Sequence, residues 1–285
     1  MTNKSNENTA FASEDIDKLL TFTKPLVMGI INLTPDSFYD GGRYANLKAV
    51  LQDVEEKIRQ GADILDLGAA SSRPGAAEIP ENEEWKRLEP VILEILKNFP
   101  KSLISVDTYR AGIASRSVEA GVRMINDISG GNGDKNMLPT MARLQVPYIV
   151  MHMKGTPQNM QLNPVYNNVV KDVAVFFEKT IETLKTLGFN KIILDPGFGF
   201  GKTTEHNYRL LKNLHVFSKF GYPLMVGLSR KSMINSVLGT NPVTALNGTT
   251  VLNSVALMNG ASILRVHDVQ EAKQAIELIS YYQKL

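Results

Sequence analysis

The chain has 285 residues, of which 43% are hydrophobic and 21% are charged, a composition typical of a globular protein. Its 31 Lys and Arg against 29 Asp and Glu leave a formal net charge of +2, and the basic residues are scattered, which argues against a nucleic acid partner. The sequence has no cysteine, which excludes disulfides, thiolate nucleophiles and cysteine-built zinc sites and fits a reducing compartment. No apolar run reaches the roughly 18 residues that a membrane span requires.

The N-terminal segment MTNKSNENTAFASEDIDKLL is polar and acidic, where a secretory signal would need an apolar stretch. We therefore expect residues 1–22 to form a polar N-terminal extension. Residues 23–285 are expected to form a single domain, located in the cytoplasm.

Eight short apolar segments then follow one another, each rich in Ile, Val and Leu and each ending in polar residues or glycine. Little polar alternation within them is typical of parallel strands that are covered on both faces. The segments are LVMGIIN (26–32), ADILDLG (62–68), LISVDT (103–108), MINDIS (124–129), YIVMHM (148–153), KIILDPG (191–197), PLMVGLS (223–229) and SILRVHD (262–268).

Longer amphipathic stretches separate these segments and are predicted to be helices. They lie at about 45–60, 81–98, 110–121, 136–145, 167–187, 204–220, 247–260 and 269–283. A short helical turn is added at RKSMINSVLG (230–239). Eight strand–helix units without a run of unpaired strands predict an α/β protein with a single (β/α)8 TIM barrel, and an open doubly wound sheet is the alternative.

Nearly every predicted strand ends in a polar side chain, and the active site of such a barrel lies at the C-terminal ends of its strands. Any one of these residues could simply cap the next helix. Together they would concentrate charge without a ligand to pair it, so we expect a flat polar heterocycle held by carboxylate and amide groups beside an anion held by Arg and Lys. The residues are Asn32, Asp66, Asp107, Asn126, Asp127, His152, Asp195, Ser229, Arg230, Lys231, Arg265 and His267.

Two loops carry further candidates. TPDSFYDGGRY (34–44) has the proline and glycines of a mobile lid, and AASSRPGAAEIP (69–80) carries Arg73, although either could be a solvated connector. The segment PGFGFGKTT (196–204) misses the spacing of a phosphate-binding P-loop by one residue. The four histidines also lack the spacing of a zinc site.

The motifs themselves resemble the dihydropteroate synthases, from the first strand to the last. In the order of that family, the chain contains MGIINLTPDSFYDGG, SSRPGA, SVDT, INDISGG, MHMKGTPQNMQ, LDPGFGFGKT, LSRKS and LRVHDV. The resemblance implies a pterin-binding catalytic domain at residues 23–285. It also implies a homodimeric transferase of folate biosynthesis that joins 6-hydroxymethyl-7,8-dihydropterin diphosphate to 4-aminobenzoate, giving 7,8-dihydropteroate and diphosphate.

The resemblance also implies a role for individual residues. The pterin would contact Asp107, Asn126, Asp195, Lys231, Met151, Gly227 and Arg265. The diphosphate would contact Asn32, Arg73, Arg265 and His267, with Asn32 as the one direct protein ligand of Mg2+. The 4-aminobenzoate would contact Ser72, Arg73, Pro74, Phe200, Lys231 and Ser232, and Asp36 and Asp40 would belong to the lid.

The implied chemistry is a dissociative substitution in which loss of diphosphate leaves a delocalised cation on the dihydropterin. Mg2+, Arg73 and Arg265 would stabilise the leaving anion, and Asp107 would offset the cation. Lys231 would reach both substrates. Catalysis is thus assigned to Asp107, Lys231, Arg265 and Arg73, with no protein nucleophile.

The second loop departs from the family pattern GESTRPG, because Ala70 stands in place of the glutamate and Ser72 in place of the threonine. The retained hydroxyl should preserve binding, whereas the lost carboxylate could alter the aminobenzoate pocket and the response to sulfonamides. Two other interpretations remain open. One is a pterin-binding methyltransferase that serves a corrinoid protein, and the other is a pterin-binding paralogue without catalysis.

Overall fold

The computed structural model describes residues 21, 23–33, 43–70, 78–160, 162 and 164–285. Eight parallel strands in these ranges form one sheet in the order β6-β5-β4-β3-β2-β1-β8-β7. The strands are β1 (Leu26–Asn32), β2 (Ile64–Gly68), β3 (Leu103–Asp107), β4 (Met124–Asp127), β5 (Tyr148–Met151), β6 (Ile192–Asp195), β7 (Met225–Val226) and β8 (Ile263–Val266). Of the predicted N-terminal extension, residues 1–22, only Thr21 lies within the described ranges.

The two outer strands of this sheet, β6 and β7, meet and close it into a barrel. An isolated parallel bridge joins Leu194 to Leu224, and the Leu194 amide donates to the Pro223 carbonyl at 2.9 Å. Because β7 has only two residues, this bridge just before it provides the closure. The predicted (β/α)8 barrel is therefore confirmed.

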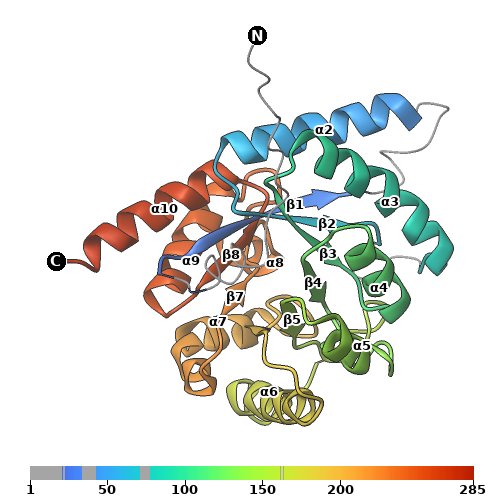
Figure 1. Cartoon of the computed structure of the whole chain (residues 1–285). Helices are drawn as coiled ribbons and strands as arrows, with labels where there is room; N and C mark the ends of the chain where they lie inside the picture. The colour runs from blue at the N-terminus through green and yellow to red at the C-terminus, as the bar shows by residue number, and fades with distance from the viewer. Residues whose placement is uncertain (1–20, 22, 34–42, 71–77, 161, 163) are drawn as a thin grey trace.

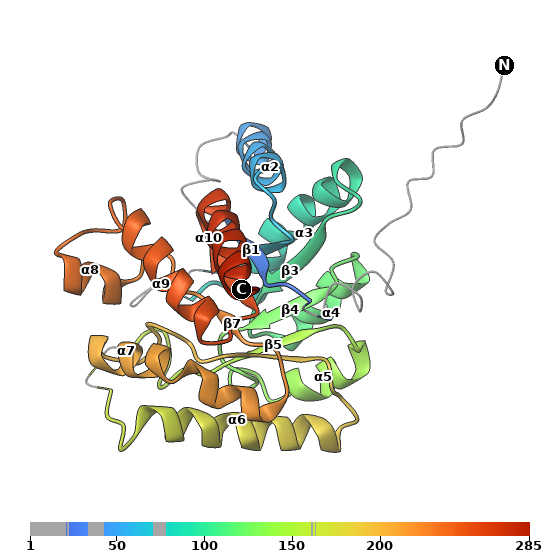
Figure 2. The same cartoon turned by 90° about the vertical axis from the view of Figure 1, so that its left-hand side faces the viewer.

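Helices surround the strands, and α2 and α6 lie on opposite sides of the barrel in both views (Figures 1 and 2). The helices are α2 (Arg43–Arg59), α3 (Glu81–Asn98), α4 (Ala111–Glu119), α5 (Met137–Leu144), α6 (Val169–Thr186), α7 (Thr204–Lys212), α8 (Ser232–Leu238), α9 (Leu246–Met258) and α10 (Val269–Tyr282). No helix in the described ranges is long and apolar enough to cross a membrane.

The helix predicted at 204–220 is interrupted. The α-helix α7 ends at Lys212, and the 3-10 helix η2 (Leu214–Phe220) follows it. Asn213 separates the two because its side-chain amide donates to the Arg209 carbonyl at 2.8 Å, a local bond that favours a helix end over helix continuation.

Two apolar cores hold the barrel together. The larger one lies between the strands and the helices and includes fully buried aromatic residues such as Phe177 and Phe217. The smaller one fills the barrel interior with side chains from all eight strands. Its members are Leu26, Met28, Ile64, Leu103, Met124, Ile149, Ile193, Met225 and Ile263. This apolar layer forms the floor of the candidate site.

Candidate active site

A second layer lies above this floor, toward the C-terminal ends of the strands. Side chains two positions apart on a strand face the same side, so the residues two positions after the floor residues also face the barrel interior. This layer consists of Ile30, Asp66, Ser105, Asn126, Met151, Asp195, Gly227 and Arg265, and Asp107 follows Ser105 by a further two positions. Six residues predicted to contact the pterin, Asp107 among them, are thus brought together inside the barrel.

Arg265 is the centre of the hydrogen-bond network in this layer. Its Nε donates to Asp66 Oδ2 at 2.7 Å, and its Nη2 donates to Asp107 Oδ2 at 2.8 Å. Asn126 Nδ2 also donates to Asp66 Oδ2, at 3.0 Å. Within the part of the chain that the structure describes, three buried oxygens in this region have no hydrogen-bond partner, namely Asp66 Oδ1, Asn126 Oδ1 and Ser105 Oγ. The layer therefore offers acceptor oxygens to a donor-rich ligand.

Burial changes the protonation of the two carboxylates expected to contact the pterin. Burial raises the pKa of Asp107 to about 7, against the opposing effect of the Arg265 charge. Burial also raises the pKa of Asp195, while the charges of Lys231 and Lys202 favour its ionised form. Asp195 Oδ1 accepts a hydrogen bond from the Gly197 amide at 2.8 Å.

Lys231 approaches this layer from the loop after β7. Its Nζ donates to the Phe198 carbonyl and lies 4.7 Å from the centroid of the Phe200 ring, close enough for a cation–π contact. Burial lowers its pKa to about 8. A Cβ added to Gly227 would lie 3.8 Å from Lys231 Nζ and 4.0 Å from Arg265 Cβ, so the glycine leaves room between the two cations.

His267, predicted to contact the diphosphate, is two residues beyond Arg265. Its Nδ1 shares a hydrogen bond with Ser229 Oγ at 3.0 Å, and its amide donates to the same oxygen at 3.3 Å. Burial, and then the charges of Arg265 and Arg230, lower the pKa of His267 to about 4. The imidazole is therefore neutral at physiological pH and can hold an anion only through a hydrogen bond.

Two of the polar strand ends do not face the barrel mouth. Asp127 accepts hydrogen bonds from Ser129, from the Gly131 amide and from the Tyr148 hydroxyl, so it shapes the loop after β4. The His152 ring packs against Phe176, with 5.1 Å between ring centroids. The expectation that these two residues line the mouth is wrong because each directly follows an inward-facing residue and points to the other side of its strand.

The remaining predicted residues lie at the rim or outside the described ranges. Asn32 is exposed at the end of β1, and Phe200 is half-buried in the loop after β6. Ser232 is exposed as the first residue of α8. Among the predicted residues, Ser72, Arg73, Pro74, Asp36 and Asp40 lie outside the described residues.

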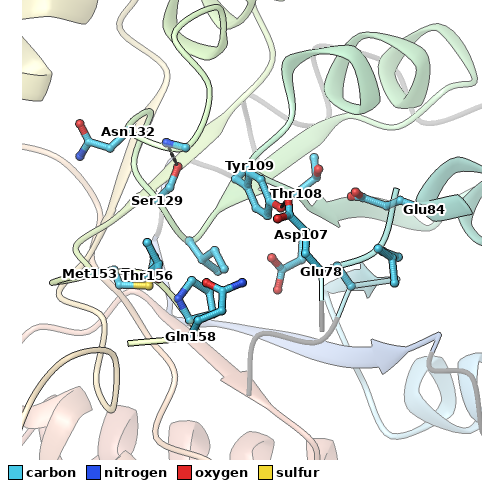
Figure 3. A pocket seen from close by; sticks show the side chains of 16 residues that line it. Glu78, Glu84, Asp107, Thr108, Tyr109, Ser129, Asn132, Met153, Thr156 and Gln158 are labelled. Atoms are coloured by element: carbon cyan, nitrogen blue, oxygen red, sulfur yellow. Dashed lines mark hydrogen bonds between the residues drawn. The ribbon is translucent and has the colours of Figure 1, made fainter. Parts of the chain in front are cut away.

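A cavity of about 320 Å³ opens beside this site, between the loops that follow β2, β3, β4 and β5. Asp107 lies on its wall together with Tyr109 and Glu78, and Thr156 and Gln158 face them in Figure 3. Of the seven residues predicted to contact the pterin, Asp107 alone lines this cavity. The cavity is therefore a neighbour of the strand-end site, with Asp107 at their common boundary.

Two important residues were given no individual role from the sequence. Asp66 was expected only as one of the polar strand ends, and the structure shows that it holds both Arg265 and Asn126. Lys202 is 3% exposed and hydrogen-bonds three backbone carbonyls in the loops after β5 and β6. Nothing in its local sequence predicts this burial, because lysine is ordinarily exposed.

Comparison with known proteins gives this geometry a context. The family described as pterin binding enzyme matches residues 28–267. The dihydropteroate synthase of Haemophilus influenzae is 42% identical over 264 residues, which cover 92% of this chain and 95% of the relative. That of Escherichia coli K12 is 41% identical over 262 residues, covering 91% and 92% of the two chains.

Solved structures of dihydropteroate synthases also match this chain along nearly its whole length. The Yersinia pestis dihydropteroate synthase in complex with a sulfonamide drug has a TM-score of 0.87 and 41% identity, covering 93% of this chain and 96% of its own. The Xanthomonas albilineans enzyme with 4-aminobenzoic acid has a TM-score of 0.86 and 36% identity, covering 93% and 95%. The closed barrel, the acceptor-rich layer around Arg265 and these matches along nearly the whole chain lead to one conclusion: the chain belongs to the dihydropteroate synthase family of pterin-binding enzymes.

Proposed function

We propose that this chain is a dihydropteroate synthase, which condenses 6-hydroxymethyl-7,8-dihydropterin diphosphate with 4-aminobenzoate and releases diphosphate. The observation that carries the proposal is the layer in which buried Asn126 and Asp195 converge with partly buried Arg265 inside the barrel. The solved Xanthomonas albilineans relative in complex with 7,8-dihydropteroate, at 34% identity and a TM-score of 0.82, supports the same reaction.

The pterin would occupy the space above the apolar floor. Asn126 uses its amide hydrogen toward Asp66, so its Oδ1 remains available to accept from a ring N–H or amino group. Asp195 would accept from the neighbouring donors. The opening at Gly227 admits a flat ring between Lys231 and the Arg265 side chain, whose planar guanidinium would stack on that ring.

The diphosphate would bind at the rim of the barrel, near Asn32 and His267, together with Arg73 and Arg265. Asn32 suits Mg2+ because it presents an exposed neutral oxygen, and this ion commonly keeps water and substrate phosphate oxygens as its other ligands. Bound there, Mg2+ would supply positive charge to the leaving diphosphate. His267 would add a hydrogen bond from a neutral ring.

In the proposed mechanism, the bond between the pterin methylene carbon and the diphosphate oxygen breaks first. The electron pair leaves with the diphosphate, which Arg73 and Arg265 stabilise, and ionised Asp107 offsets the cation on the pterin. The aminobenzoate nitrogen then forms the new carbon–nitrogen bond and gives up a proton to the released diphosphate or to solvent water. The lid residues Asp36 and Asp40 would belong to the segment that excludes water from the cation.

The aminobenzoate would bind where Lys231, Phe200 and Ser232 meet, completed by Ser72, Arg73 and Pro74. The Lys231 ammonium suits the benzoate carboxylate, and the Phe200 ring provides an apolar face for the arene. The same ammonium lies beside Gly227 at the pterin site, so one side chain contacts both substrates.

The experiment that tests this proposal measures diphosphate release by the purified chain. The reaction contains the dihydropterin diphosphate, Mg2+ and 4-aminobenzoate, with each omitted in turn as a control. We expect release only with all three, together with formation of 7,8-dihydropteroate. Pterin binding without release would contradict the proposal and favour the methyltransferase or the non-catalytic paralogue.

We further propose that the chain acts as a homodimer in the cytoplasm. Val251, Val255 and Met258 are exposed on one face of α9 at helical spacing, which makes this helix a candidate interface. Sedimentation of the purified chain tests this, because Val255→Glu should convert the dimer to monomer while Leu93→Glu, at an exposed position of α3, should leave it intact. The cysteine-free composition supports the location in a reducing compartment.

A further inference from the structure

Lys202 occupies an unusual position for a lysine. Its side chain is buried, and the ammonium group donates to the carbonyls of His152, Gly197 and Phe200 at 3.1, 2.9 and 3.0 Å. A lysine ammonium has three donor hydrogens, so each one has an acceptor here. Burial lowers the pKa of Lys202 well below its usual value, and the three carbonyl dipoles offset part of the cost of placing a charge there.

The three carbonyls belong to two different loops. His152 follows β5, whereas Gly197 and Phe200 lie in the β6–α7 loop, which we define as residues 196–203. Lys202 therefore joins the end of β5 to the loop that carries Phe200. No other side chain in the described residues bonds to both of these segments.

The β6–α7 loop is shaped to allow this close approach. Gly197 and Gly201 have positive φ values of 70° and 62°. A Cβ on Gly197 would lie 2.0 Å from the His152 carbonyl oxygen, and one on Gly201 would lie 2.3 Å from the Lys154 carbonyl oxygen. Only glycine permits this contact between the loop and the end of β5.

The same loop positions two groups at the aminobenzoate side of the site. The Phe198 carbonyl accepts from Lys231, and the Phe200 ring lies 4.7 Å from Lys231 Nζ. Movement of the loop would therefore displace the aromatic face and the lysine together. Asp195 and Asn126 lie on strands and would keep their positions, because the barrel hydrogen bonds hold them.

We propose that Lys202 is a positioning residue for the arylamine substrate, acting through the β6–α7 loop on Phe200 and Lys231. The inference deepens the proposed function and rests on it. Lys202 contacts neither substrate in this arrangement. Its effect is greater on the aminobenzoate than on the pterin, because the loop carries Phe200 and holds Lys231, whereas Asn126 and Asp195 lie on strands.

The test compares Lys202→Met with Lys212→Met, a control that removes an exposed lysine from the same α7 region. Methionine has a similar length but leaves the three carbonyls without their donor. We expect the KM for 4-aminobenzoate to rise about tenfold or more, as for the loss of hydrogen bonds to a charged group. The Kd of a pterin analogue should rise less, by about threefold, because the loop also holds Lys231 and the Lys202 charge favours ionised Asp195.

Amide hydrogen exchange provides a readout that does not need turnover. In Lys202→Met, the amides of residues 197–203 should exchange faster, while those of β4 and β6 remain protected. Equal weakening of pterin and aminobenzoate binding would overturn the proposal. An unchanged KM for 4-aminobenzoate in a variant whose loop amides exchange faster would also overturn the proposal.

A second variant covers the case in which Lys202→Met does not fold. The Tyr166 hydroxyl donates to the Gly201 carbonyl at 2.8 Å, so Tyr166→Phe loosens the same loop and keeps the buried ammonium. In Tyr166→Phe we expect a smaller rise in the KM for 4-aminobenzoate. An unchanged KM together with faster amide hydrogen exchange in the loop would contradict the role of the loop. If the wild-type chain released no diphosphate, the proposed function would fail first. Normal wild-type turnover with a normal KM in the variants would overturn only the positioning role.

Discussion

Arg265 reaches over β1 to Asp66, and its Nε lies 2.7 Å from Asp66 Oδ2. Asp66 is fully buried, and Arg265 also bonds Asp107 from its other nitrogen. Two carboxylates therefore fix the guanidinium plane beneath the proposed pterin position. This relationship explains how a long and flexible side chain can provide a rigid surface for a flat ring.

Asp66→Ala should destabilise the protein, because it leaves the partly buried guanidinium of Arg265 with only one carboxylate. Breaking a buried ion pair costs about 3–5 kcal/mol, and urea denaturation should show a loss of this size in the free energy of unfolding. Glu205→Ala breaks the exposed pair with Arg209 and serves as the control, for which almost no change is expected. Similar losses in both variants would show that Asp66 has no special role.

The pH dependence of kcat/KM should be bell-shaped. Asp107, with a pKa near 7, carries its charge above that pH, whereas Lys231, with a pKa near 8, carries its charge below that pH. Activity should therefore decline below about 7 and above about 8 in the free enzyme. Lys231→Arg should move the alkaline limb upward because arginine stays protonated. If the alkaline limb stays at the same pH in Lys231→Arg, that limb belongs to the titration of another group.

Asp107 should also influence stability as the pH changes. The folded protein holds this proton up to a pH of about 7, whereas the ordinary value for aspartate is 3.8. Between these values the folded state binds more protons than the unfolded state, so this residue makes stability fall as the pH rises through that window. Thermal unfolding of Asp107→Asn should lack this part of the pH dependence. An identical dependence in the variant and the wild type would refute the assignment.

Asp195→Ala and Arg73→Ala should separate the two halves of the site. Asp195 is buried among the pterin contacts, so its loss should weaken binding of a pterin analogue strongly. Arg73 is assigned to the diphosphate and the aminobenzoate, so its loss should spare pterin binding and slow turnover. Calorimetry on both variants gives the comparison, and equal losses of pterin affinity would rule out the assignment.

Arg110 should be needed to keep Glu84 buried. Its Nη1 bonds Glu84 Oε2 at 2.5 Å, and its Nη2 bonds Glu78 and the Ile79 carbonyl. Burial already raises the pKa of Glu84, so Arg110→Met would leave a buried carboxyl without its charged partner and should cost about 3 kcal/mol of stability. Adding Glu84→Gln should recover part of this loss in chemical denaturation. A purely additive double variant would mean that the two side chains do not interact.

The sequence alone determined the fold class and much of the site. Eight apolar segments that alternate with amphipathic helices can be buried on both faces only as a parallel sheet covered by helices, and the motif order identified the family. Asp107, Asn126, Asp195, Lys231 and Arg265 could be predicted because polar residues at strand ends meet at one face of a barrel.

The tertiary structure alone decided which of the polar strand ends face the barrel. Strand parity turns Asp127 and His152 away from the mouth, and it brings Asp66 under Arg265, almost 200 positions later in the chain. The burial of Lys202 likewise depends on carbonyls from two loops that only the closed barrel brings together. The local sequence encodes hydrophobic periodicity, but packing selects which residues distant in the chain become partners. These contacts therefore could not be predicted from the local sequence.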